Sequence, residues 1–348
     1  MHPSPQQPAG YNDEHQADSN VLFGTIYVDM TTYNSNGEVA CAICQDDTGT
    51  TDVYVQWGRA ECSNGHMTQY SGWSMSGGYT DYAQNNLCVD KQFAKSNKNY
   101  TSVFRTDMVS HLFSTIIYTD TCSRDDYVSG NVVPCAVCSP VKRTRVFTHW
   151  GSRACPAPHA TKIYDGFMTG SGDLDRGGGS SFLCMHPIPQ ALETVGAIYT
   201  NRLYAVEYGV TGSLDKHEYQ DAACAVCEYS NTPAVYVQWG RATCSNQHTT
   251  QYTGLIMSSS SDVSNKAENI CVDLARAVHP GSRRADFKYF SKIYTSEMFA
   301  GAADESAYPE YREVTCAVCS PSYTIQGDCL ISVACQIHCV SDCLAGRL

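Results

Sequence analysis

Cysteine is the residue whose spacing in this sequence is most informative about chemistry. Nineteen cysteines occur in 348 residues, and some of them form Cys-x-x-Cys pairs about 90 residues apart. The pairs are Cys41/Cys44, Cys135/Cys138, Cys224/Cys227 and Cys316/Cys319. Pairs of this kind can bind zinc, carry out thiol–disulfide exchange or form structural disulfides.

Structural disulfides are the favoured interpretation. Ala with Val or Ile separates the two cysteines of each pair, which is typical of a β-strand, where residues i and i+3 project to opposite faces. Each pair would send one sulfur to each side of a sheet, toward the single cysteines of the same unit. Zinc and redox chemistry remain the alternatives, although no second pair lies nearby and no helix start follows. The expected disulfide cysteines are Cys41, Cys44, Cys62, Cys88, Cys135, Cys138, Cys155, Cys184, Cys224, Cys227, Cys244, Cys271, Cys316 and Cys319.

The remaining cysteines are candidates for disulfides between molecules. An odd total requires that at least one thiol stays free or pairs with another chain. The candidates are Cys122, Cys329, Cys335, Cys339 and Cys343. The last three are spaced by four residues and would line one face of a short helix. A locally paired tail, a metal site with His338 and a wrongly assigned terminal exon are the alternatives.

Aromatic residues recur beside the cysteines. Trp57, Tyr70, Trp239 and Tyr252 are candidate ligand contacts, because exposed Trp and Tyr rings stack on sugars. A Trp in an apolar strand beside a disulfide more often belongs to the core, and this is the stronger expectation. The histidines four residues after a cysteine have two interpretations, a ligand or pH-sensing site and a turn next to a core tyrosine. They are His66, His159 and His248.

No motif predicts catalysis or a cofactor. Gly-x-Ser-x-Gly, His-Glu-x-x-His and a recurring carboxylate pair are all missing from the sequence. The glycine-rich loop at residues 170–181 contains Asp173 and Asp175 but lacks the further ligands of a calcium loop and the Lys-Ser or Lys-Thr of a phosphate loop. We therefore expect a protein without catalytic residues, metal or cofactor. Asn99 begins one acceptor motif for glycosylation, Asn-Tyr-Thr.

The elements that carry these residues form a repeat. The segment VYVQWGRAECSN at residues 53–64 returns as VYVQWGRATCSN at residues 235–246. Three units follow, at residues 53–138 (unit 1), 145–227 (unit 2) and 235–319 (unit 3), and units 1 and 3 resemble each other more than unit 2. Their β-branched and aromatic residues alternate with small or polar ones. The sequence predicts an all-β fold, with two tandem disulfide-rich domains built from units of about 90 residues as small sandwiches or barrels.

The repeat also suggests domain limits. We expect a disordered segment at residues 1–20, a partial first domain at 21–139, a complete second domain at 140–320 and a cysteine-rich tail at 321–348. Residues 21–44 resemble only the closing part of a unit of the type of unit 2, which suggests an incomplete N-terminus.

Composition indicates the compartment and excludes some partners. So many regularly spaced cysteines favour an oxidising compartment, so we expect a secreted, extracellular protein. The first ten residues lack the apolar stretch of a signal peptide, which an incomplete N-terminus would explain. The net charge of −12 disfavours nucleic acid, and the sequence has no apolar run long enough for membrane insertion.

The order of elements and cysteines carries a resemblance to a known family. Unit 2 contains RVFTHWGSRACP, KIYDGFMTG, RGGGSSFLCMHP, LYAVEYGV and ACAVC, and unit 3 contains CSNQHTTQYTGLIMS, NICVD and VTCAVC. Together they resemble the cysteine-rich non-collagenous C-terminal domain of invertebrate short-chain, spongin-type collagens, as a whole domain over residues 145–319 and as a partial one over 21–138. The chain departs from that family because it has no Gly-X-Y run, and its 26 glycines cannot supply one.

The resemblance implies a matrix or secreted protein whose domain associates or binds, without catalysis. The expected function is therefore that of an extracellular matrix or adhesion glycoprotein acting by self-association and by binding matrix proteins or glycans. The alternative is a lectin-like defence or recognition module. A zinc-held intracellular scaffold is a weaker third hypothesis.

Overall fold

The computed structural model describes the three units and part of the segment before them. The described residues are 24–27, 38–45, 52–92, 110–118, 127–156, 158, 160–190, 200–209, 216–230, 232, 234–282, 291–299, 301, 306 and 309–321. These residues form eighteen strands and no α-helix. The prediction of an all-β, disulfide-rich fold is confirmed.

Each unit contributes its own strands. Before the units lies β1 (Thr25–Tyr27). Unit 1 comprises β2 (Tyr54–Trp57), β3 (Met67–Ser76), β4 (Ala83–Gln84), β5 (Leu87–Asp90), β6 (Ser110–Ile117) and β7 (Pro134–Ser139). Unit 2 comprises β8 (Thr144–Trp150), β9 (Ala160–Gly170), β10 (Gly178–Gly179), β11 (Leu183–Met185), β12 (Asn201–Tyr208) and β13 (Ala223–Ser230). Unit 3 comprises β14 (Tyr236–Trp239), β15 (Thr249–Ser258), β16 (Ile270–Asp273), β17 (Ser291–Thr295) and β18 (Thr315–Ser320).

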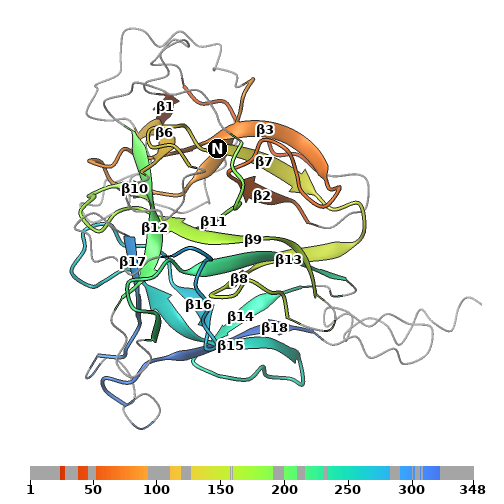
Figure 1. Cartoon of the computed structure of the whole chain (residues 1–348), viewed down its shortest axis with the longest axis vertical. Helices are drawn as coiled ribbons and strands as arrows, with labels where there is room; N and C mark the ends of the chain where they lie inside the picture. Colours follow the sequence, from red (N-terminus) through yellow and green to blue (C-terminus); the bar gives the residue numbers. More distant parts are fainter. Residues whose placement is uncertain are drawn as a thin grey trace, which may run out of the picture.

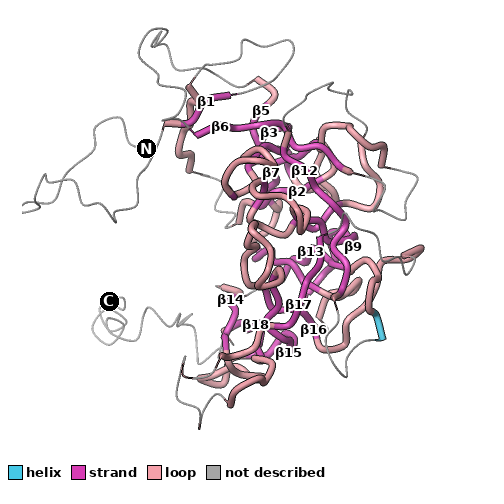
Figure 2. Tube along the Cα trace, turned by 90° about the vertical axis from the view of Figure 1, so that its left-hand side faces the viewer, coloured by secondary structure: helices cyan, strands magenta, loops and turns pink. Residues whose placement is uncertain are grey.

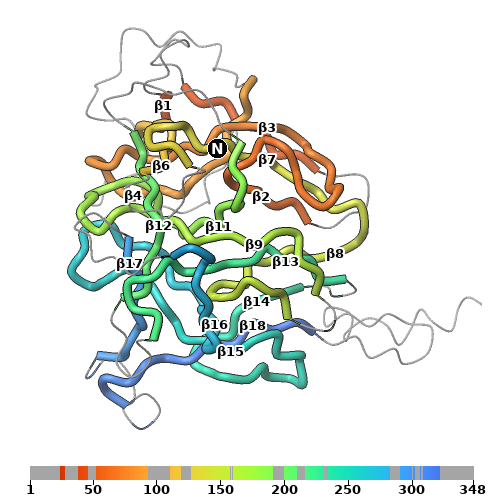
Figure 3. The backbone as a smooth tube through the Cα atoms, viewed as in Figure 1, coloured from red at the N-terminus to blue at the C-terminus, as the bar shows by residue number. Residues whose placement is uncertain are grey.

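The Cys-x-x-Cys strand is the centre of each unit. β7 lies between β2 and β3, β13 between β8 and β9, and β18 between β14 and β15, all antiparallel. The alternation of small and β-branched residues in these strands suits a position covered on both faces, and every Cys in them is fully buried. The chain therefore builds three similar three-stranded groups, which follow one another along the longest axis (Figures 1 and 3).

Disulfides fasten each central strand on both sides. Its first cysteine bonds a cysteine of the short strand β5, β11 or β16. Its second cysteine bonds a cysteine in the loop after the Trp strand, which is the strand that ends in tryptophan (β2, β8 or β14). The six pairs are Cys62–Cys138, Cys88–Cys135, Cys155–Cys227, Cys184–Cys224, Cys244–Cys319 and Cys271–Cys316. These sulfurs are therefore bonded to each other and not to zinc.

Cys41 and Cys44 differ from the prediction. Both are free and exposed, so the expectation that they form structural disulfides is wrong for this structure. In each complete unit, the partners of the pair come from the Trp-strand loop and the short strand that precede it. No cysteine occurs among residues 1–40, so this pair has no equivalent partners in the sequence.

Successive units are joined edge to edge. The short strand β11 of unit 2 pairs in parallel with β2 of unit 1, placing Met185 opposite Trp57. In the same way β16 of unit 3 pairs with β8 of unit 2, placing Val272 opposite Trp150. A second connection is a parallel ladder, β1-β6-β12-β17, with one strand from each unit and β1 from the segment before them. Figure 2 shows the strands of all three units continuing down one elongated body.

These connections close barrels between units. The first barrel follows β3-β7-β2-β11-β9-β12-β6 and returns to β3. The second follows β9-β13-β8-β16-β15-β17-β12 and returns to β9. The first core includes Phe167, Met185 and Leu203, and the second includes Met168, Tyr208 and Met257. The first barrel takes strands from both sides of residue 139, which is the expected limit between the two domains. The division into two domains stays a prediction.

Candidate binding site at the junctions between units

Two clefts lie where successive units meet, and three of the four candidate aromatic residues line them. The first cleft lies between units 1 and 2, has a volume of about 270 Å³ and is lined by Trp57. The second lies between units 2 and 3, has a volume of about 290 Å³ and is lined by Trp239 and Tyr252. Tyr70 lines neither, because it occupies in unit 1 the place that Tyr252 occupies in unit 3, and no complete unit precedes it among the described residues.

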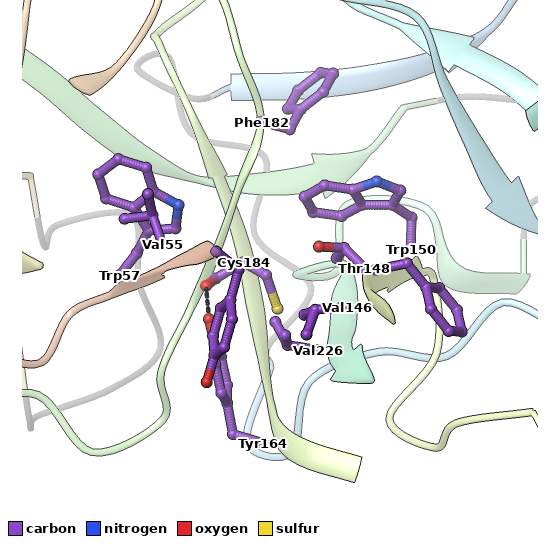
Figure 4. Close-up of a pocket in the computed structure, with 11 residues that line it drawn as sticks. Val55, Trp57, Val146, Thr148, Trp150, Tyr164, Phe182, Cys184 and Val226 are labelled. Atoms are coloured by element: carbon purple, nitrogen blue, oxygen red, sulfur yellow. Dashed lines mark hydrogen bonds between the residues drawn. The ribbon is translucent and has the colours of Figure 1, made fainter. Parts of the chain in front are cut away.

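The first cleft has aromatic walls. Strand β2 supplies Trp57 on one side and β8 supplies Trp150 on the other, while Tyr164 and Phe182 lie between them (Figure 4). Alternate residues of a strand face the same side, which explains why Val55 joins Trp57 in the lining. Aromatic walls of this kind suit stacking against flat apolar surfaces of a ligand. They offer few side-chain groups that could form hydrogen bonds or covalent bonds with it.

The second cleft also has an aromatic lining, and one of its walls is more polar than those of the first cleft. Trp150 lines this cleft as well, together with Trp239 and Tyr252. Glu268 and Asn269 add a carboxylate and an amide that the first cleft lacks. Burial raises the pKa of Glu268, opposed by hydrogen bonds from the Phe182 backbone and Ser181.

Tyr164 of the first cleft and Tyr252 of the second each join two units through the hydroxyl group. The Tyr164 hydroxyl donates to the carbonyl oxygen of Cys184 at 2.9 Å and accepts a hydrogen bond from the backbone N–H of Trp57. The Tyr252 hydroxyl likewise donates to Cys271 at 3.0 Å and accepts from the backbone N–H of Trp150. Burial raises the pKa of both tyrosines, so each hydroxyl remains a neutral donor. These hydroxyls are occupied by the fold.

Tyr70 makes only half of this connection. Its hydroxyl donates to the carbonyl oxygen of Cys88 at 3.0 Å, the equivalent of the Cys184 and Cys271 bonds. Burial also raises its pKa, with smaller contributions from Asp90 and Cys44. Tyr70 therefore has the geometry of a junction tyrosine, with no complete unit before it in the described part of the chain.

Polar residues fasten the junctions outside the clefts. His66 Nε2 lies 3.2 Å from Glu228 Oε2, and Asn64 donates to the other oxygen of Glu228, also at 3.2 Å, so a turn of unit 1 is held by unit 2. At the second junction, His149 Nε2 lies 2.7 Å from Asp273 Oδ2, and the His149 ring stacks on Tyr252 with centroids 4.0 Å apart. Both contacts join residues far apart in sequence.

Of the recurring histidines, two are placed by the structure. His66 Nδ1 lies 3.0 Å from the Tyr54 hydroxyl, and His248 Nδ1 lies 2.7 Å from that of Tyr236. His159 lies outside the described residues. Both described histidines therefore belong to the turn after the Tyr-Val-Gln-Trp strand, and of these two only His66 has a carboxylate from the next unit beside it. Sequence reasoning missed Glu228, which is serine in units 1 and 3, and Asp273, which recurs as Asp90 in unit 1 but is His186 in unit 2.

The glycine-rich loop of unit 2 packs against neighbouring units. The Asp175 carboxylate is buried and accepts a hydrogen bond from the N–H of Gly172 at 3.2 Å. Burial raises its pKa to about 6, against the opposing effect of Arg202. Asp173 accepts from the backbone N–H of Lys292 in unit 3. No cluster of metal-binding side chains occurs among the residues that the structure describes.

Several predicted sites lie outside the described residues. They are Asn99, Cys122, Cys329, Cys335, Cys339 and Cys343. Their predicted roles in glycosylation and in disulfides between molecules stay predictions.

No protein-family model matches this chain, and no curated protein is significantly similar to it. Within the described part of the chain, no helix has the length and apolar character needed to span a membrane. The resemblance to short-chain collagens therefore rests on the cysteine order and motifs alone.

Proposed function

We propose that this protein is a secreted, non-catalytic structural protein of the extracellular matrix, which acts by self-association and by binding matrix partners. The observation that carries the proposal is the open sheet edge at both ends of the unit stack. At one end, β5 pairs only with β3, and at the other, β14 pairs only with β18, among the described residues. The equivalent strands at the two internal junctions are paired on both sides.

Open edges favour association. A strand edge presents unpaired N–H and C=O groups, to which another chain can add a strand. The six disulfides support the extracellular part of the proposal, because such bonds persist in oxidising compartments. They also rigidify the units, as a load-carrying matrix component requires.

Sedimentation velocity of the secreted protein would test this function. We expect the average mass to rise with concentration after free thiols have been alkylated, since the proposed contact is non-covalent. A second measurement would compare binding to extracellular matrix with binding to serum albumin. A protein that stays monomeric up to about 100 μM, the weak end of specific association, and ignores matrix would contradict the proposal.

A carbohydrate-binding function is the second candidate, and the inter-unit clefts favour it. Trp57 and Trp150 face each other across one cleft, and Trp239, 47% exposed, borders the other. Exposed Trp rings stack on the apolar faces of sugars. Saturable binding to a glycan array that is lost in Trp239→Ala, with all six disulfides retained, would support this function; its persistence in that variant would contradict the assignment.

A further inference from the structure

The two open ends of the stack are complementary halves of the junction that the molecule already contains twice. We infer that the β14 edge of one copy docks on the β5 edge of a second copy, so that copies associate head to tail. This inference rests on the proposed self-association and names its surfaces. We call the β14 edge with Trp239 the tail face, and the β5 edge with Leu87 and Tyr70 the head face.

The tail face provides a natural comparison, because the same sequence occurs elsewhere in a covered position. Tyr-Val-Gln-Trp forms β2 in unit 1 and β14 in unit 3. Gln56 of β2 is fully buried and Trp57 is partly buried, where unit 2 covers them, whereas Trp239 of β14 is 47% exposed. Identical residues thus differ in exposure because only one copy of the strand has a neighbouring unit.

The head face shows the same contrast. Leu87 begins β5 and is 49% exposed, whereas its equivalents at the internal junctions, Leu183 of β11 and Ile270 of β16, are 4% and 6% exposed. Burying a Leu side chain stabilises an association through the hydrophobic effect. Both halves of one interface are therefore exposed at opposite ends of the same molecule.

The internal junctions also fix the register. Met185 lies opposite Trp57 and Val272 lies opposite Trp150, both in parallel strands. By position in the repeat, Val89 of the head face would lie opposite Trp239 of the tail face. The Tyr70 hydroxyl would then accept a hydrogen bond from the N–H of Trp239, as Tyr164 accepts from Trp57.

Among the described residues, a short strand is what a docked copy would displace at the head face. β1 pairs with the first residues of β6, just as β6 itself pairs with the first residues of β12, so the equivalent segment of unit 3 in a docked copy would replace β1 there. The ladder of β1 with β6 and the ladders between units each pair three residues. Residues 40–45 are exposed and form no strand. Docking would therefore replace the ladder of β1 by one of equal length and would add the contact between β14 and β5.

Two blocking variants and their mixture test this arrangement. Trp239→Arg blocks the tail face and Leu87→Arg blocks the head face, because each places a charge in an apolar contact. Leu174→Arg, at an exposed position 62% accessible in the unit 2 loop, is the matched control. All variants are prepared with free thiols alkylated, and intact mass verifies the six disulfides. Sedimentation velocity is the measurement.

Head-to-tail docking predicts a specific pattern. Each blocking variant alone is monomeric, the control associates as the natural protein does, and an equimolar mixture of the two variants forms a dimer and nothing larger, since one intact head meets one intact tail. If Leu87→Arg still associates while Trp239→Arg does not, and mixing restores nothing, pairing is tail to tail and the inference is wrong. If both variants associate normally, self-association stands but these faces do not carry it. If the natural protein itself stays monomeric, the proposed function fails as well.

Discussion

At the scale of single residues, the junctions depend on tyrosine hydroxyls. Replacing Tyr164 by Phe leaves the carbonyl oxygen of Cys184 and the N–H of Trp57 without their partner in a buried site. An unpaired buried polar group costs about 1–3 kcal/mol. We therefore expect Tyr164→Phe to lower the free energy of unfolding by roughly that amount, as measured by urea denaturation with disulfides intact.

Tyr70→Phe is the matched control for this prediction. Tyr70 makes the bond to Cys88 but is only partly buried, so water can replace the lost partner. We expect a loss below about 1 kcal/mol. Equal losses in the two variants would show that the contact between units adds nothing to the hydroxyl's contribution.

Asp175 makes stability depend on pH. Its pKa is about 6 in the folded protein, above the ordinary value of 3.8, because burial penalises the charged form. The folded state therefore binds the proton more tightly, so this contribution to stability is fully present below about pH 4 and is lost as the pH rises through about 6. At pH 7 the charged carboxylate costs on the order of 3 kcal/mol.

Asp175→Asn should remove this dependence. An amide oxygen can still accept from Gly172, so we expect the variant to be more stable than the natural protein at pH 7 and equally stable near pH 4. Urea midpoints at the two pH values measure the difference. A variant that is less stable at pH 7 would show that the carboxylate charge is needed, for example by Arg202.

At the scale of elements, one glycine in each unit allows two strands to approach closely. A Cβ at Gly72, Gly166 or Gly254 would collide with the backbone carbonyl oxygen of the short cysteine strand beside it. Backbone atoms cannot move aside as a flexible side chain can. This close approach explains why the glycine recurs two residues after the junction tyrosine.

Gly254→Ala should therefore separate β15 from β16. We expect a loss of about 2–3 kcal/mol in the free energy of unfolding, the range of overpacked cores. Gly281→Ala is the control, because its Cβ would meet open space and only its φ of +84° is unfavourable, at about 1 kcal/mol. Thermal melts of both variants measure the difference. If the two lose the same stability, collision with the Val272 carbonyl is not what selects glycine.

The sequence predicts the individual strands of this fold better than their assembly. The Cys-x-x-Cys strands and the Tyr-Val-Gln-Trp strands follow from local alternation, which a short window contains. The ladder pairing of Ile116 with Arg202 leaves no local signal, because it joins strands that are far apart in the sequence. For the same reason the pattern placed Trp57 and Tyr252 among the candidate contacts but did not reveal that a tyrosine hydroxyl binds the neighbouring unit. The prediction for Cys41 and Cys44 was wrong for another reason. The repeat pattern implied partner cysteines before this pair, and residues 1–40 contain none.

At the scale of the whole molecule, the two barrels share β9 and β12, so their stabilities should be coupled. Each barrel takes strands from two units, and β12 pairs with β6 of unit 1 at one end and with β17 of unit 3 at the other. A disturbance at one junction can therefore reach the next through a shared strand. A chain of independent domains would confine it.

Asn201, at the start of β12, allows this coupling to be measured. It is fully buried and donates to Asn86 at 3.0 Å and to Thr115 at 2.8 Å, both in unit 1, and it accepts from the N–H of Gly179 at 3.2 Å. In Asn201→Ala these groups lose their partner, so we expect faster amide hydrogen exchange in β6 and β12. Because β12 belongs to both barrels, we also expect faster exchange in β17, which Asn201 does not contact. Ser261→Ala, in an exposed turn of unit 3, should change only its own turn. Hydrogen exchange followed by mass spectrometry distinguishes the cases: an effect of Asn201→Ala that stops at β12 would mean that the barrels open independently despite the strands they share.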